Sequence, residues 1–437
     1  MPENLGPHLL ALESLGLIRP LQEEPDLVYR FRHGLTQEAV YASVTRRQRR
    51  SLHLMIGQVL DELNPERKDE VVDLLAYHFA AAGDATRAGI YARLAAQRAL
   101  STYAYDEAVL HLQRALKVVD VDGPDETRWT LYEALGDVHA LLHQGTRAID
   151  SYQRALSILE RLPHSDRTDA IRLHRKVVQM GSEIKWAIDR DAFQDVNRAV
   201  QASGESLDRS LELIHGPSPH PETVRLLSVL SVAAWRMRHP PDWQTAAGHA
   251  RAAVRMAIHL GSPVEHSVAL EALGNALFGL GQLRQSLEAA EQRLEISRQP
   301  GFPDERECLD ALRGAACAMV YVGEYEQAIP LLLEAEQAAQ RMQSADQIFN
   351  VMALLTQCWF RLDRWDEIRS RRGLWEDFER RFPQERTGPL CWPQGLRAVV
   401  CTLSGDVEAG TALRDRSFGT MVRTFGQEGG WLRNAHY

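Results

Sequence analysis

Aromatic, amide and arginine side chains recur at helical spacing in the second half of the chain, and these types can bind a ligand together. The set comprises Trp235, Asn275, Phe278, Arg313, Tyr321, Gln357 and Arg361. Guanidinium groups bind carboxylates and phosphates through paired hydrogen bonds, and aromatic faces attract rings and cations. The pattern predicts a groove for an anionic or hydroxyl-rich ligand, with Arg313 and Arg361 at its basic end and Trp235 at the other.

Signatures of catalysis and of metal binding are missing from the sequence. No Gly-Lys pair occurs, so the chain carries no phosphate loop of the GxxxxGK[ST] type. The motifs HExxH and GxSxG do not occur either. His215 and His220 lie near each other in a segment rich in proline and glycine, but two histidines fall short of a zinc site. We therefore expect a non-enzymatic protein with no catalytic residues, no metal and no cofactor.

Charge and composition narrow the class of partner. The 437 residues carry a net charge of −9, which does not favour nucleic-acid binding. The one basic run, Arg46 to Arg50, places Arg46, Arg49 and Arg50 on one helix face. We interpret it as a solvated face or as a surface that docks on another domain; phosphate binding is the other reading.

Location is inferred from apolar runs and from cysteines. No apolar run approaches the ~20 residues that span a bilayer, and no signal peptide is evident. The five cysteines show no disulfide framework, which fits a reducing compartment. We expect a cytoplasmic protein without a membrane partner.

The elements that position the candidate ligand residues repeat about every forty residues, a period typical of helical solenoids. Each predicted pair of antiparallel helices has a small or apolar residue near the start of its second helix. These anchors are Ala108, Ala148, Ala247, Ser286, Ala328, Ile368 and Gly410. The wide gap between Ala148 and Ala247 leaves room for two further divergent repeats.

Two of the repeats resemble the tetratricopeptide motif. Leu135-Gly136-Asp137, followed by Ala148, Tyr152 and Ala155, matches its pattern of Leu-Gly, Ala, aromatic and Ala. Leu273-Gly274-Asn275 matches as well, but Ser286 and Arg293 stand where alanine is usual. The resemblance implies an all-α, right-handed superhelix whose first helices line the concave side. Small residues should be buried where helices cross: Gly136, Ala148, Ala155, Gly274 and Ala328.

The N-terminal region is similar to a junction in bacterial STAND-type signalling ATPases, which are multidomain regulators. The residues are Tyr29-Arg30-Phe31-Arg32-His33, Gln37-Glu38-Ala39-Val40-Tyr41, the arginine-rich stretch to His53, Ala76-Tyr77-His78-Phe79 and Ala82-Gly83-Asp84. The similarity implies the end of a winged helix at 1–34, with a β-hairpin near 17–31. Connecting helices at 35–70 and a repeat array at 71–437 would follow.

Two functions are compatible with this organisation. In the first, the array binds an inducer, either a small molecule or a protein. It then relays binding through a helix from Leu35 to Leu63 to an upstream nucleotide-binding module. In the second, the array is a passive protein-interaction scaffold. The junction favours the first. Binding of a chaperone's C-terminal carboxylate is not expected, because Glu133, Asp137 and Glu271 stand where that activity needs lysine or asparagine.

Overall fold

α-Helices form most of the chain in the computed structural model. It describes residues 5–22, 28–63, 68–102, 104–142, 144–163, 166–187, 193–214, 219–238, 240–381 and 387–425. The chain divides into two compact units, residues 1–164 and 165–437. Each unit is described by itself below.

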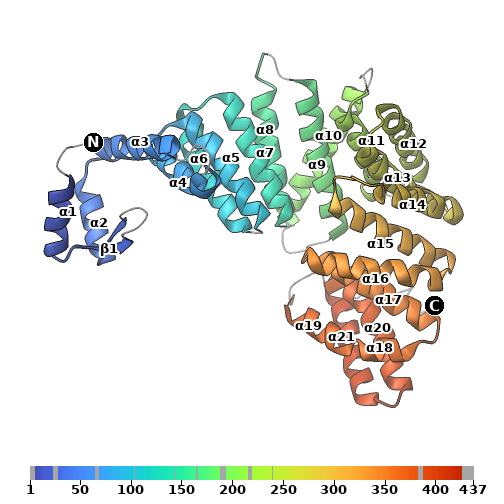
Figure 1. Ribbon diagram of the computed structural model, residues 1–437. Helices are drawn as coiled ribbons and strands as arrows, with labels where there is room; N and C mark the ends of the chain where they lie inside the picture. The colour runs from blue at the N-terminus through green and yellow to red at the C-terminus, as the bar shows by residue number, and fades with distance from the viewer. Residues whose placement is uncertain are drawn as a thin grey trace. The chain divides into compact units, whose positions relative to one another are not determined.

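The first unit opens with a small mixed segment and continues as a run of helices (Figure 1). Its elements are α1 (Leu5–Ser14), β1 (Ile18–Gln22), β2 (Val28–Phe31), α2 (Gly34–Ser43), α3 (Arg46–Leu63), α4 (Lys68–Ala82), α5 (Ala85–Ser101), α6 (Tyr105–Asp122), α7 (Asp125–Leu141) and α8 (Gly145–Leu159). β1 and β2 pair antiparallel, with Ile18 opposite Phe31. This confirms the predicted hairpin, whose turn at 23–26 lies outside the described residues.

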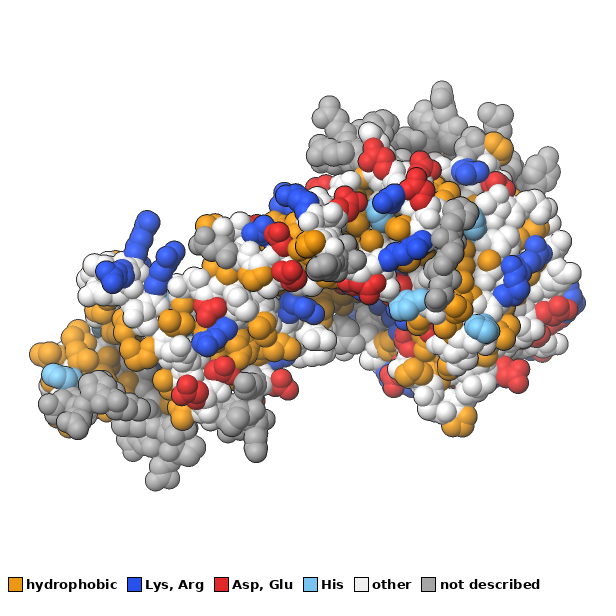
Figure 2. Space-filling model, turned by 90° about the horizontal axis from the view of Figure 1, so that it is seen from above, with side chains coloured by type: hydrophobic (Ala, Val, Ile, Leu, Met, Phe, Trp, Pro, Cys, Tyr) orange, Lys and Arg blue, Asp and Glu red, His pale blue; other side chains and the backbone are white. Residues whose placement is uncertain are grey.

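The segment from α1 to α2 has little interior of its own. Ile18 is the one large apolar side chain described as buried there, whereas Leu10, Leu15 and Leu35 are 64%, 71% and 80% exposed. Hydrophobic side chains accordingly gather at the left end of Figure 2, where Figure 1 places α1 and α2. An isolated two-stranded hairpin is at best marginally stable in water, and the described side chains here add little buried apolar area to it. The winged-helix assignment and the boundaries at 34 and 70 remain predictions.

The segment expected to relay binding, from Leu35 to Leu63, consists of two helices, α2 and α3, rather than one continuous helix. The first helix ends at Ser43, and Thr45 caps the start of the second, because it forms a capping box with Gln48. The Gln48 backbone N–H donates to Thr45 Oγ1 (3.3 Å), and the Thr45 N–H donates to Gln48 Oε1 (3.2 Å). The sequence motif Thr-x-x-Gln therefore indicates where the second helix begins.

The second unit consists of helices throughout its described residues. They are α9 (Arg167–Ala187), α10 (Phe193–Ile214), α11 (Pro221–Arg236), α12 (Trp243–Leu260), α13 (Pro263–Gly279), α14 (Leu283–Ser297), α15 (Glu305–Val322), α16 (Tyr325–Arg341), α17 (Ala345–Arg361), α18 (Trp365–Ser370), α19 (Arg372–Arg381), α20 (Thr387–Leu403) and α21 (Val407–Phe425). Consecutive helices pack as pairs: α9 with α10, α11 with α12, α13 with α14 and α15 with α16.

One pair, α9 and α10, lies between the repeats of Ala148 and Ala247, rather than the two that the gap predicted. The reason is length, because these helices have 21 and 22 residues whereas α13 and α14 have 17 and 15. Extra helical turns therefore occupy the length of sequence in which a second additional repeat was expected.

The predicted anchors lie where the repeat requires them. Ala148 is fully buried in the first turn of α8, and Ala328 is fully buried in the first turn of α16. Gly136, Ala155 and Gly274 are buried as well. Together with the paired helices, this confirms the tetratricopeptide-like fold. The right-handed twist stays a prediction.

The turns after α15 and α17 follow one hydrogen-bonding scheme. After α15, Gly323 adopts φ +88°, and the next N–H, of Glu324, donates to the Met319 carbonyl. After α17, Asp363 adopts φ +51°, and the Arg364 N–H donates to the Trp359 carbonyl. This is the Schellman arrangement, which favours glycine at the left-handed position. Asp363 thus occupies a glycine position of the repeat.

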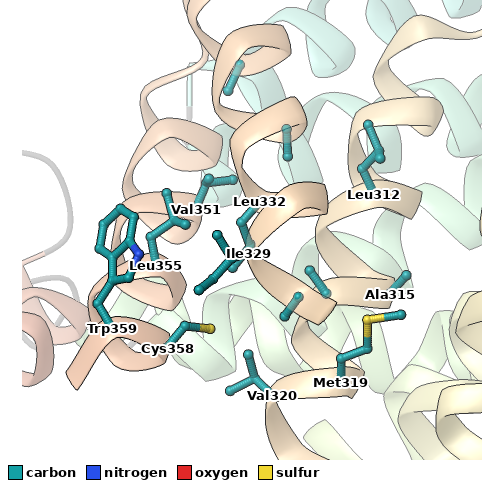
Figure 3. Packing of buried hydrophobic residues seen from close by; sticks show 14 of the residues in the cluster. Leu312, Ala315, Met319, Val320, Ile329, Leu332, Val351, Leu355, Cys358 and Trp359 are labelled. Carbon is teal, nitrogen blue, oxygen red and sulfur yellow. The ribbon is translucent and has the colours of Figure 1, made fainter. Parts of the chain in front are cut away.

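Buried apolar side chains of the consecutive helices α15, α16 and α17 pack against one another (Figure 3). The labelled residues come from three helices: Leu312, Ala315, Met319 and Val320 from α15, Ile329 and Leu332 from α16, and Val351, Leu355, Cys358 and Trp359 from α17. This buried cluster therefore runs from one repeat into the next. Among the described helices, none combines the length and apolar character needed to cross a membrane.

Candidate functional site

Alternate helices of the second unit lie against one another: α13 contacts α15, and α15 contacts α17. They are the first helices of consecutive pairs, so their outward faces form one continuous surface. We call it the first-helix surface and define it by residues Asn275, Phe278, Arg313, Tyr321, Gln357 and Arg361. The structure exposes Asn275, Phe278, Tyr321 and Arg361, and leaves Arg313 and Gln357 half-buried.

Phe278 of α13 and Tyr321 of α15 are in direct contact. Their ring centroids are 4.5 Å apart at an interplanar angle of 53°, yet the residues are 40% and 54% exposed. The pair therefore presents a bare aromatic surface in addition to its mutual contact. Burial, and then the neighbouring Cys317, raises the pKa of Tyr321, so its hydroxyl stays neutral at physiological pH. The structure thus brings these two predicted residues together.

A buried arginine underlies the same surface. Arg293 of α14 is 3% exposed, and its Nε donates to Glu307 Oε1 of α15 at 2.9 Å. Its Nη2 lies 3.2 Å from Glu271 Oε2 of α13. Burial opposes the charge of Arg293, but Glu271 and Glu307 more than compensate and raise its pKa. The residue that departs from the tetratricopeptide alanine therefore ties three helices together and orients Glu271.

Arg313 is already paired, which changes its expected role. Its Nη2 donates to Asp310 Oδ1 at 3.2 Å, one turn earlier on α15. Gln347 of α17 donates to the same oxygen at 2.7 Å. Asp310 offsets part of the charge of Arg313, and the assignment of Arg313 as a ligand contact stays a prediction. The sequence analysis missed Asp310 and Gln347; the Asp-x-x-Arg spacing on one helix face was the available signal.

Trp235 is stacked inside its own helix pair. Its ring lies 5.1 Å from that of Trp243 of α12, at an interplanar angle of 20°. The side chain is half-buried, and the Arg236 guanidinium lies 4.9 Å from its ring centroid. The assignment of Trp235 as a ligand contact stays a prediction, as do those of Asn275, Gln357 and Arg361.

Other residues considered in the sequence have structural roles. Asp137 accepts a hydrogen bond from Tyr152 Oη (2.8 Å), which fastens α7 to α8. His220 caps α11, because its Nδ1 accepts from the Glu222 N–H at 3.2 Å. His215 lies outside the described residues. Within the described part of the chain, no group of three or more histidine, cysteine or acidic side chains is placed to hold a metal.

The basic run at the start of α3 is mostly solvated. Arg46, Arg47 and Arg50 are exposed. Arg49 differs, since its guanidinium lies 4.9 Å from the centroid of the Tyr41 ring. The solvated-face interpretation therefore applies to three of the four arginines.

Comparison with known proteins identifies the fold. No protein-family model matches the sequence, and no curated protein sequence matches it. A STAND protein with a tetratricopeptide repeat sensor, from Pyrococcus horikoshii, has a similar structure, with a TM-score of 0.51 and 13% sequence identity. The alignment covers 98% of this chain and 59% of that one, so this chain spans well under two thirds of the ATPase.

Two further structures resemble the chain less closely. One is the Rap conjugation gene regulator of plasmid pLS20 in complex with the Phr* peptide: TM-score 0.49, 13% identity, 82% of this chain and 95% of that one. The other is aspartyl phosphate phosphatase F from Bacillus subtilis: TM-score 0.47, 14% identity, 86% of this chain and 94% of that one. At these identities the comparisons show a tetratricopeptide-like helical-repeat fold and nothing more specific.

Proposed function

We propose that the chain is the non-catalytic sensor region of a signal-transduction ATPase and that its first-helix surface binds an inducer or a protein partner. The observation that carries the proposal is the exposed contact between Phe278 and Tyr321 on consecutive repeats. Exposed aromatic side chains concentrate at binding surfaces, because their rings contribute much apolar area at little entropic cost. The STAND protein of similar fold carries such a sensor, which supports the assignment.

The chemistry around the aromatic pair indicates what the surface prefers. Asn275 and Gln357 add amide donors and acceptors, and Arg361 adds an exposed cation. Asp310 offsets Arg313, so the centre of the surface is close to neutral. We expect a ligand with an apolar or ring-bearing group over Phe278 and Tyr321 and with hydrogen-bonding groups beside it. A peptide or a protein segment meets this description better than a small polyanion.

The binding site is tested by screening peptides and metabolites for thermal stabilisation of the whole chain. A ligand at a hundredfold excess over its Kd stabilises the folded state by ~2.7 kcal/mol. Phe278→Ala with Tyr321→Ala should abolish the stabilisation. Ile258→Ala is the matched control, because Ile258 is 60% exposed but lies on α12, a second helix. Equal stabilisation of wild type and the double variant would place the ligand elsewhere.

Amide hydrogen exchange with the same ligand bound distinguishes a sensor from a passive scaffold. In a sensor, binding at α13 and α15 changes the amide hydrogen exchange of residues 34–63, which connect the array to the N-terminal segment. In a scaffold, exchange changes at the binding surface alone. The scaffold remains the alternative function, and a hit that protects α13 and α15 without affecting 34–63 would favour it.

A further inference from the structure

The contact between α2 and α3 is made by rings rather than by an apolar core. No residue of α2 is buried. The two helices are separate (Figure 1), with α2 ending at Ser43 and α3 beginning at Arg46. Tyr41, in the last turn of α2, reaches the side chain of His53 on α3. The hydrogen bond of Tyr41 with His53 therefore joins α2 to the helical array without an apolar core between them.

Three rings form a hydrogen-bonded chain across three helices. Tyr41 Oη lies 3.0 Å from His53 Nε2, and His53 Nδ1 lies 2.9 Å from His78 Nδ1 of α4. His53 is 7% exposed, so water does not replace these partners. The rings also pack on one another, with centroids 6.0 Å apart for Tyr41 and His53 and 5.0 Å apart for His53 and His78. Both ring nitrogens of His53 are therefore engaged.

The number of protons on the two imidazoles decides whether the hydrogen bonds between Tyr41, His53 and His78 can form. With both imidazoles neutral, one proton lies between the two Nδ1 atoms, donated by either ring. One added proton is tolerated, because His53 can then donate to Tyr41 Oη and to His78 Nδ1. A second added proton puts an N–H on each Nδ1, and two donors facing each other at hydrogen-bond distance repel.

We propose that Tyr41, His53 and His78 form an acid-sensitive joint, which holds α2 against the helical array while at least one of the two histidines is neutral and releases it when both are protonated. The joint is a property of the first unit and does not depend on ligand binding at the first-helix surface. Protonation of the joint would control the attachment of α2, which belongs to the segment 34–63 through which a sensor would act.

The groups that face the joint favour its neutral form. From α3, Arg49 lies over the Tyr41 ring. From α4, Tyr77 packs edge-on to His53 and shares a side-chain hydrogen bond with Tyr41. From α6, Arg114 lies 5.9 Å from the Tyr77 ring. Burial, then Arg49, lowers the pKa of His53. Burial, then His53, lowers the pKa of His78. Since both folded-state pKa values lie below the ordinary 6.5, the stabilisation by the joint is complete above pH 6.5 and is lost as the pH falls below it.

Hydrogen–deuterium exchange of the whole chain, read at residues 34–43 and corrected for the intrinsic pH dependence of amide exchange, tests the joint. In wild type, protection of this segment should be present at about pH 7.5 and should fall on acidification to about pH 5. Tyr41→Phe removes one hydroxyl and keeps the ring over Arg49. It should raise exchange of the segment about fivefold at the higher pH, the usual effect of losing one hydrogen bond.

His78→Asn is the decisive variant, because an amide can stand in for Nδ1 but does not titrate. It should keep protection at both pH values. His139→Asn is the control, since His139 is also buried in the first unit and bonded to Gln144, but lies outside the joint. It should respond to acid like wild type. Acid-insensitive exchange in wild type, or an undiminished acid response in His78→Asn, would overturn the proposal.

Discussion

Replacing Arg293 by alanine restores the residue that a tetratricopeptide repeat normally has at this position, yet we expect it to destabilise the second unit. The change leaves Glu307, whose side chain is 10% exposed, with the Ser267 hydroxyl as its remaining hydrogen-bond partner described here. Removing one member of a buried ion pair costs about 3–5 kcal/mol. The contact with Glu271 adds little, because that side chain is 40% exposed and solvent screens the pair.

The loss should appear as a fall in the melting temperature of the second unit on the order of 10 °C. Arg298→Ala is the matched control. Arg298 ends the same helix and pairs with Glu334, but both side chains are about half exposed, so we expect a cost below about 1 kcal/mol. Equal effects of the two substitutions would refute the reasoning, since burial would then not decide the strength of the pair.

The destabilisation should also depend on pH in a defined direction. Burial raises the pKa of Glu307, and Arg293 opposes that rise. Without Arg293 the pKa rises further, so acid protonates the carboxyl and removes the buried charge. Urea denaturation should therefore show a larger difference between variant and wild type at pH 8 than at pH 5. A difference that grows on acidification would contradict the assigned network.

Two further predictions concern backbone positions of the repeat. Alanine at Gly136 places its Cβ 2.4 Å from the Tyr152 ring, whereas at Gly274 the nearest atom is 3.6 Å away. Gly136→Ala should therefore cost about 1–3 kcal/mol through overpacking, less the ~1 kcal/mol gained in helix propensity, and Gly274→Ala should be neutral or stabilising. Thermal denaturation of both variants decides this, and the same sign for both would contradict the packing. Asp363→Gly should stabilise the turn after α17 by up to about 1 kcal/mol, because it removes a side chain from φ +51°; a lower melting temperature would contradict the assigned turn.

The fold was predictable because its determinants are local. A small residue where two helices cross shows as a fixed spacing in the sequence, and Ala148, Ala247 and Ala328 all proved to be buried anchors. The capping box at Thr45 and Gln48 was equally readable and was overlooked. Helix length was not predictable from the sequence. The sequence pattern of α9 and α10 does not distinguish two long helices from a larger number of short ones.

The candidate site was predictable only in part, because exposure depends on neighbours that are distant in sequence. Phe278 and Tyr321 were placed on consecutive first helices from the repeat alone, and they meet. The pairing of Trp235 with Trp243 lies in tight packing that also involves the next helix, because a Cβ on Gly279 of α13 would lie 2.2 Å from the Trp243 ring. The partners of Arg293 come from two neighbouring helices, and they became evident only when burial was known.

The buried anchor residues lie on the second helices, and the exposed residues of the first-helix surface lie on the first. This separation affects how the binding specificity of such a protein can evolve. Anchors such as Ala247, Ser286 and Ala328 lie on second helices and are buried, whereas Asn275, Phe278 and Tyr321 lie on first helices and are exposed. Mutations at the exposed positions can alter what is recognised without disturbing the stacking, since surface substitutions seldom shift stability by more than about 0.5 kcal/mol. A combinatorial library varied at these three exposed positions, with the anchors left intact, should consist mainly of folded members and would sample new specificities on an unchanged frame.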